Sequence, residues 1–177
     1  MGANELQSVL RECFAAYDGR SPALLSETAD RFREREGFLQ AVLLLVADEH
    51  RMISEGATWV LKSELEKGAC LDRALMARLI ADLDKLTAWQ AKLHICQIVG
   101  HFVVPEGDRE TLRRWLIGLL DADRPFLRAW ALDGLCTLPD TPVEMFLDRL
   151  EQDDAASVRA RVRKIKQRIE RRGPKRS

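Results

Sequence analysis

The feature that most constrains the fold is a helix-length pattern of apolar and small residues that recurs four times. The four copies are MISEGATWVLKSEL from Met52, LTAWQAKLHICQI from Leu86, FLRAWALDGLCTL from Phe126 and SVRARVRKIKQRI from Ser157. Within each copy the apolar residues are three or four apart, which is the spacing of one face of an α-helix. A pattern that returns at intervals of this length predicts a stacked array of two-helix units.

Aligning the four copies places residues of one kind at the same position. The first aligned position holds Ile53, Thr87, Leu127 and Val158, at offsets of 34, 40 and 31 residues. Four residues later stand Ala57, Ala91, Ala131 and Val162. We expect these small side chains to let neighbouring helices approach closely, while the larger apolar side chains on either side fill the interface.

A second helical stretch precedes each copy. These stretches are Phe38 to Ala47, Leu71 to Leu83, Glu110 to Leu120 and Val143 to Leu150. No segment of useful length alternates with a period of two, so the chain is predicted to be all-α, with about ten short helices. The turns between paired helices are acidic and contain Asp48, Asp84, Asp121, Asp123, Asp153 and Asp154. In each turn an aspartate is expected to accept from free N–H groups at the start of the next helix.

The third and fourth copies carry the clearest family pattern. Arg128 and Arg159 follow the first aligned position, where we expect each to reach the aspartate of an adjoining turn. Asp123 to Arg128, followed by Ala131, Leu135 and Leu138, resembles a HEAT repeat, and Asp153 to Arg159 with Val162 and Ile169 resembles it again. The two earlier copies have Ser54 and Ala88 in place of the arginine, so any Arg–Asp ladder is partial.

This resemblance to HEAT/armadillo-like repeats implies a right-handed α-solenoid of about five helix pairs. Residues 1–170 would form one domain, with Glu5 to Tyr17 and Pro22 to Arg35 as a divergent first pair. Eight residues after the first aligned position, three copies have Leu61, Ile95 and Leu135, and the last copy has Lys166. A polar residue is expected there, because no further repeat covers the outer face of the last one. Residues 171–177 are expected to be a basic, disordered tail.

Charge is divided unevenly along the chain. The segment 155–177 has ten Lys or Arg and one acidic residue, a net charge of +9, and the remainder has a net charge of −9. Such an asymmetry concerns the choice of partners more than the fold. The basic end is the part of the chain suited to nucleic acid, but phosphate binding favours a broad positive surface, which the acidic body opposes.

Composition excludes several classes of protein. The longest apolar run, Ala41 to Ala47, is far shorter than the ~20 residues that a membrane-spanning helix needs. The first residues, MGANEL, show no secretory signal, so a cytoplasmic location is expected. Four scattered cysteines without a CxxC pair are expected to be small buried apolar residues. We therefore expect no metal, no disulfide framework and no cofactor.

In the HEAT family the second helices line the concave face, and this implies a candidate binding surface here. The residues expected on that face are Trp59, Gln90, His94, Gln97, His101, Trp130, Asp133, Arg161, Lys164 and Arg168, with Gly56, Ser63 and Thr137 beside them. The tryptophans would anchor a bound peptide or helix. Alternatively, Trp59 and Trp130 are partly buried packing residues. His94 and His101 lack a third metal ligand and are expected to be solvated.

The favoured function is a non-catalytic protein-binding scaffold or adaptor, because the chain shows no nucleophile arrangement, phosphate-binding glycine loop or paired carboxylates. The partner is expected to be another protein or a peptide, and no membrane is involved. The alternative is an enzyme of DNA repair. Some HEAT-like bacterial proteins are alkylpurine DNA glycosylases that use concave aromatic residues and an aspartate beside a basic channel, an arrangement that Trp130 and Asp133 resemble. A lyase or cofactor-handling role has no support from particular residues.

Overall fold

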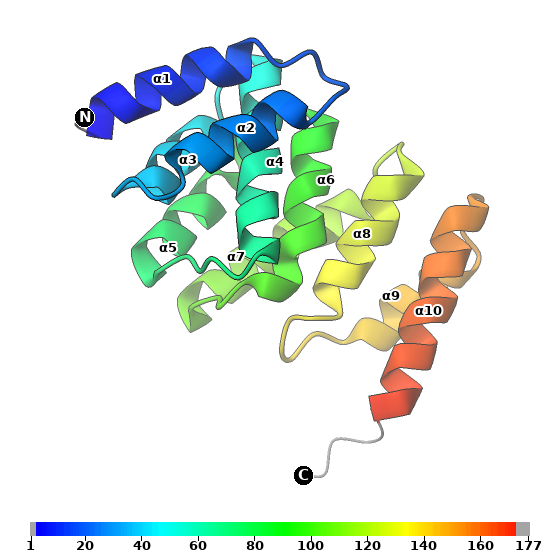
Figure 1. Ribbon diagram of the computed structural model, residues 1–177. Helices are drawn as coiled ribbons and strands as arrows, with labels where there is room; N and C mark the ends of the chain where they lie inside the picture. The colour runs from blue at the N-terminus through cyan, green and yellow to red at the C-terminus, as the bar shows by residue number, and fades with distance from the viewer. Residues whose placement is uncertain (1–2, 173–177) are drawn as a thin grey trace.

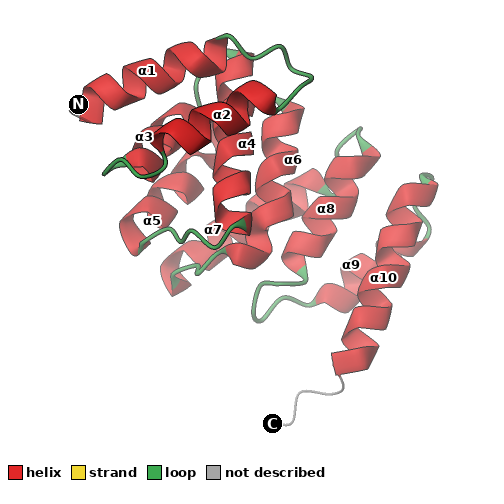
Figure 2. Cartoon of the chain, in the orientation of Figure 1, coloured by secondary structure: helices red, strands yellow, loops and turns green. Residues whose placement is uncertain are grey.

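The computed structural model describes residues 3–172, which contain ten α-helices and two short 3-10 helices and no strand (Figures 1 and 2). The elements are α1 (Ala3–Ala15), α2 (Ala23–Phe32), α3 (Phe38–Val46), α4 (Arg51–Glu66), α5 (Arg73–Asp82), η1 (Leu83–Lys85), α6 (Trp89–Ile98), η2 (Val99–His101), α7 (Glu106–Leu119), α8 (Pro125–Leu135), α9 (Val143–Glu151) and α10 (Ala156–Arg172). The prediction of an all-α chain is confirmed.

The helices pack in two rows. In one row α2 contacts α4, α4 contacts α6, α6 contacts α8 and α8 contacts α10. In the other row α1 contacts α3, α3 contacts α5 and α5 contacts α7. Figure 1 shows α4, α6, α8 and α10 standing side by side, with α5, α7 and α9 behind them. The α1–α2 pair and the α9–α10 pair lie at opposite ends. No helix among residues 3–172 combines the length and the apolar character needed to cross a bilayer.

Small residues lie where the second helices pack. Ala57, Ala91 and Ala131 are fully buried, as the alignment predicts. Thr87 is exposed and precedes α6, although the residues aligned with it, Ile53, Leu127 and Val158, are buried. Leu86 and Ala88 are buried on either side of it, in the short segment between η1 and the start of α6 at Trp89.

Gly56 was expected on the open face of α4 but is buried in the structure. A Cβ atom at this position would lie 3.1 Å from Leu25 Cδ2 and 3.1 Å from Phe14 Cβ. The absent side chain therefore lets α4 approach α1 and α2 closely. The expectation failed because the first helix pair covers this part of α4.

The acidic turns behave as predicted in two pairs of helices. Asp48 Oδ1 accepts from the His50 N–H at 2.9 Å, and Asp153 Oδ1 accepts from the Ala155 N–H at 2.8 Å. Asp123 has no equivalent bond because the residue two places later, Pro125, lacks an N–H group. Within residues 3–172, Asp84 and Asp121 accept from no backbone N–H either, since Asp84 lies inside η1 and Asp121 pairs with an arginine. For the two turns that contain Asp84, Asp121 and Asp123, the prediction is wrong.

Two further expectations need correction. The helix α10 continues to Arg172, so the first two residues of the predicted tail 171–177 are helical, and residues 173–177 lie outside the described part. Cys70 is exposed rather than buried, because it lies in the turn between α4 and α5. Cys96, in α6, is buried as expected, and burial raises the pKa of its thiol.

Candidate functional site

A hollow of about 250 Å³ lies between α6, α8 and α10, on the row of second helices. Its walls are formed by Cys96, Gln97, Gly100, His101, Trp130, Asp133, Gly134, Thr137 and Arg168. Five of these, Gln97, His101, Trp130, Asp133 and Arg168, belong to the surface predicted from the sequence. Because α6, α8 and α10 are consecutive second helices, their packing brings these side chains together from three separate segments of the chain.

Asp133 is the centre of the polar contacts at this hollow. Its side chain is 11% exposed and accepts from Arg161 Nη1 at 2.8 Å and from Arg168 Nη2 at 2.5 Å. Both arginines come from α10, seven residues apart, and therefore lie on one face of that helix. Two guanidinium groups around one carboxylate leave a net positive charge. Asp133 was expected to face solvent, but it is covered by these arginines.

Trp130 lies one helical turn before Asp133 on α8, and a guanidinium group lies over its ring. The Arg161 guanidinium carbon is 3.8 Å from the centroid of the Trp130 ring, a cation–π contact. Arg161 is thus held by both the ring and the Asp133 carboxylate. We name Trp130, Asp133, Arg161 and Arg168 the Asp133 cluster. In this cluster Arg161 and Arg168 are already held in place, so less side-chain conformational entropy would be lost when a ligand binds.

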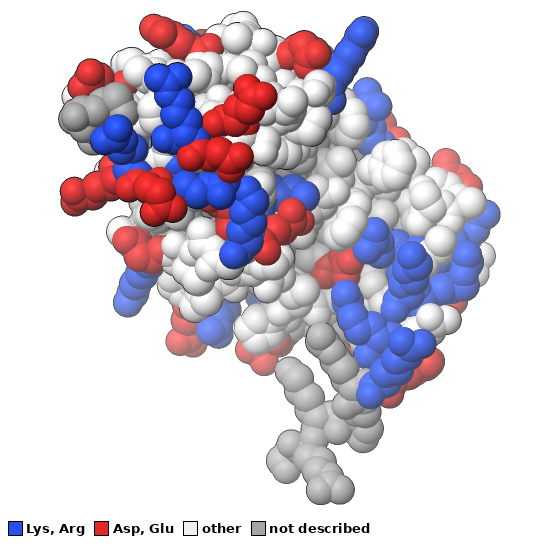
Figure 3. Space-filling model, in the orientation of Figure 1, with Lys and Arg blue, Asp and Glu red and all other residues white. Residues whose placement is uncertain are grey.

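The surface around the Asp133 cluster is basic. Lys164 is exposed and lies on the same face of α10 as Arg161 and Arg168, three and four residues away. Figure 3 shows Lys and Arg side chains gathered over α10, whereas over α1 to α4 the two signs are intermixed. His101, at the end of η2, is exposed at the opposite wall of the hollow. The site therefore favours an anionic ligand.

Five of the ten predicted residues lie outside the walls of this hollow: Arg161 and Lys164, described above, and Trp59, Gln90 and His94. Trp59 is half-buried and packs against the core, which matches the alternative interpretation of it as a packing residue. Gln90 is half-buried, and its Oε1 atom is buried without a hydrogen-bond partner among the residues that the structure describes. His94 Nδ1 lies 3.0 Å from the Thr58 hydroxyl, between α6 and α4. Its expected solvation is therefore wrong.

The environment of His94 makes its neutral form the stable one. Burial is the main cause that lowers the pKa of His94 to about 4; nearby Lys62 acts in the same direction and Glu66 opposes it. Because the unfolded chain binds the proton at about pH 6.5 and the folded chain only at about 4, stability is complete above pH 6.5 and falls as the pH drops toward 4.

We expect this histidine to remove about 3 kcal/mol of stability between pH 7 and pH 4. Replacing His94 with Gln keeps a hydrogen-bonding group beside Thr58 and removes the titration. Denaturant unfolding at both pH values should show a smaller loss in the variant than in the wild type. An equal loss in the two proteins would contradict the assignment.

Sequence reasoning missed the small residues and the thiol that complete the hollow. Gly100 and Gly134 lie in its wall, and a Cβ atom at Gly134 would lie 3.2 Å from Val99 Cγ2. Cys96, expected only to be a small buried residue, lines the hollow beside Gln97. Two glycines at helical positions are a signal of close approach that was available in the sequence.

The described residues 3–172 hold no group of three or more His, Cys, Asp or Glu side chains arranged to bind a metal ion. His101 and the hollow's one carboxylate do not make such a group. The Asp133 cluster also offers no nucleophile with an adjacent base. The groups that the cluster presents are the arginine N–H donors and the apolar side chain of Trp130.

No family model matches the chain, and a search of curated proteins finds no match either.

Proposed function

We propose that this chain is a HEAT-like, right-handed α-solenoid of five helix pairs that binds another protein without catalysis. The support for the architecture is the order of the contacts, since each second helix packs on the next from α2 to α10. The support for the recognition role is a surface of convergent side chains on that row. Cytoplasmic function is part of the proposal, because Cys13, Cys70, Cys96 and Cys136 are all free thiols.

The Asp133 cluster is the observation that carries the proposal. Arg161 and Arg168 keep 25% and 40% of their side chains exposed while one carboxylate positions both. Guanidinium groups held in this way donate paired hydrogen bonds to carboxylates with little further ordering. The ligand of this site is therefore an acidic segment of a partner protein, seated in the hollow beside Trp130.

The proposal predicts that Trp130→Ala reduces the partner recovered by affinity capture about 10-fold or more. The Trp130 side chain lines the hollow and its ring also holds Arg161, so the substitution removes an apolar contact and releases an arginine of the site. Trp89→Ala is the matched control. The Trp89 ring, at the start of α6, also lies beneath an arginine, with the Arg124 guanidinium carbon 4.4 Å from its centroid, but it does not line the hollow. We expect Trp89→Ala to capture the same partner as the wild type. Equal recovery with Trp130→Ala would remove the hollow as the docking site.

A second candidate is excision of alkylated bases from DNA. The observation that favours it is that Trp130, Asp133 and Arg168 line one hollow beside a basic helix. The same geometry opposes it, because Asp133 already pairs with two arginines and the Trp130 ring lies under Arg161. Under the protein-binding proposal the chain passes through heparin at ~0.15 M salt and releases no base from an alkylated duplex. Base release that disappears in Asp133→Asn would replace the proposal with this one.

A further inference from the structure

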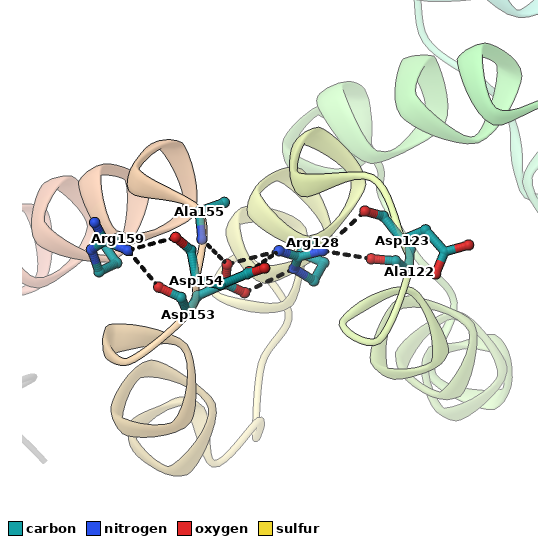
Figure 4. Close-up of polar contacts among 7 residues, drawn as sticks. All are labelled: Ala122, Asp123, Arg128, Asp153, Asp154, Ala155 and Arg159. Carbon is teal, nitrogen blue, oxygen red and sulfur yellow. Dashed lines mark hydrogen bonds and ion pairs between the residues drawn. The ribbon is translucent and has the colours of Figure 1, made fainter.

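Arg128 joins the α7–α8 pair to the α9–α10 pair by using both sides of its guanidinium group (Figure 4). On one side its Nη1 donates to the Ala122 and Asp123 carbonyl oxygens of its own turn, at 2.8 and 3.2 Å. On the other side its Nε and Nη2 donate to the two Asp153 carboxylate oxygens, both at 2.8 Å. Nη2 also lies 2.8 Å from Asp154 Oδ1. The expectation that Arg128 reaches an adjoining turn is confirmed.

Arg159 repeats one half of this arrangement, 31 residues later. Its Nη1 donates to the Asp153 and Asp154 carbonyl oxygens of its own turn, at 2.6 and 2.9 Å (Figure 4). The contact with an aspartate is missing, because no carboxylate among residues 3–172 accepts from the remaining N–H groups of Arg159. The expectation that Arg159 reaches an adjoining turn is therefore not met within one chain. Arg159 is held in the orientation that Arg128 uses to bind an aspartate.

At the opposite end of the helix rows, the α1–α2 turn contains an aspartate that resembles those bound by arginines elsewhere in the chain. Asp48 and Asp153 each accept a backbone N–H two residues later and also accept from an arginine of the preceding helix pair, Arg11 and Arg128 respectively. Asp18, in the α1–α2 turn, accepts the same backbone bond from the Arg20 N–H at 2.8 Å. It is exposed, and within residues 3–172 no arginine from another helix pair contacts its carboxylate. The backbone N–H groups of Arg20 and Ser21, which donate to Asp18, lower the pKa of its carboxyl group.

We propose that a second copy of this chain docks head to tail, with its Asp18 accepting from Arg159. The direction agrees with the two contacts inside the chain, where the arginine belongs to one helix pair and the aspartate to the next. The charge of the Arg159 end agrees as well, because residues 155–177 have a net charge of +9 and so attract an exposed carboxylate such as that of Asp18. A contact between two different ends is heterologous, so it builds open chains or closed rings of subunits rather than an isologous dimer. This association is independent of the Asp133 cluster.

The test is sedimentation velocity of the full chain over a range of concentrations at about 0.05 M and 0.5 M salt, where electrostatic screening differs widely. The average mass of the wild type should rise with concentration at low salt and much less at high salt. Arg159→Asp and Asp18→Arg should each weaken self-association about tenfold or more, the effect of losing a charged hydrogen-bonded pair. Arg163→Asp, an exposed position on the same helix, is the control for net charge.

An equimolar mixture of the two charge-reversal variants distinguishes pairing from damage to the fold. In the mixture the two substituted positions face each other with their charges exchanged, and the unsubstituted Arg159 and Asp18 face each other as in the wild type. Association should therefore return. Asp18→Asn retains an acceptor for the turn and should still weaken the association. The proposal is overturned if the wild type stays monomeric at every concentration, if both reversals associate as the wild type does, or if the mixture fails to recover.

Discussion

Replacing Gly56 with leucine is expected to lower the free energy of unfolding by about 3 kcal/mol. The position is buried in α4, and even a Cβ atom there would lie 3.1 Å from Phe14 Cβ and Leu25 Cδ2. Phe14 and Leu25 are themselves fully buried, so neither can move toward solvent. A leucine must force α1 and α2 away from α4. For a chain of this size the melting temperature should fall by roughly 6 to 12 °C.

Gly118→Leu is the matched control for this substitution. Gly118 also lies in a helix, α7, but nothing lies within 4 Å of the Cβ position and the residue is exposed. Because leucine has the higher helix propensity, we expect a gain in stability of up to about 1 kcal/mol. Thermal unfolding of both variants checks the pair. A Gly56→Leu protein as stable as Gly118→Leu would contradict the close approach of the first helix pair.

The second large effect is expected for Arg128→Gln, at about 2 to 3 kcal/mol of lost stability. The Arg128 and Asp153 side chains are only 12% and 6% exposed, so removing the guanidinium leaves a buried carboxylate without its charged partner. Arg149→Gln is the control, because Arg149 pairs with Asp121 across the same two helix pairs but both side chains are exposed. Exposed pairs contribute about 0 to 1 kcal/mol. Urea unfolding should separate the two variants clearly.

The same contact also sets an acid dependence. The hydrogen bonds from Arg128 lower the pKa of Asp153 to about 2. Because the unfolded carboxyl titrates near pH 3.9, the stabilisation is complete above that pH and is lost as the pH falls toward about 2. In Arg128→Gln the pKa of Asp153 moves back toward its ordinary value. The variant should therefore lose less stability than the wild type on acidification from about pH 5 to about pH 2.

The sequence predicts the parts of the fold that depend on helical periodicity. Apolar spacing indicated about ten helices, and the aligned small residues placed Ala57, Ala91 and Ala131 in the buried contacts. It misplaced Thr87 and Gly56, because what covers a helix face depends on neighbours that periodicity within one segment does not specify. The Arg128 contact was predictable, since the motif itself contains both the arginine and the acidic turn.

The candidate site was predicted only in part, for a related reason. Counting residues along α8 and α10 placed Trp130, Asp133, Arg161 and Arg168 on the correct row of helices. Residue counting did not show that Asp133 pairs with the two arginines, because that contact depends on the position of α10 along the axis of α8. His94 was assigned to solvent because its partner, Thr58, lies on another helix.

Arg128 of α8 joins the last two helix pairs by donating to Asp153 in the turn before α10. The shape of the hollow and the orientation of Arg159 both depend on this contact. Its most direct test is the coupling energy between Arg128 and Asp153, measured by urea unfolding of Arg128→Gln, Asp153→Asn and the double variant. The structure predicts a coupling of about 2 kcal/mol, because the second substitution has little left to remove. Additive effects, with a coupling near zero, would contradict it.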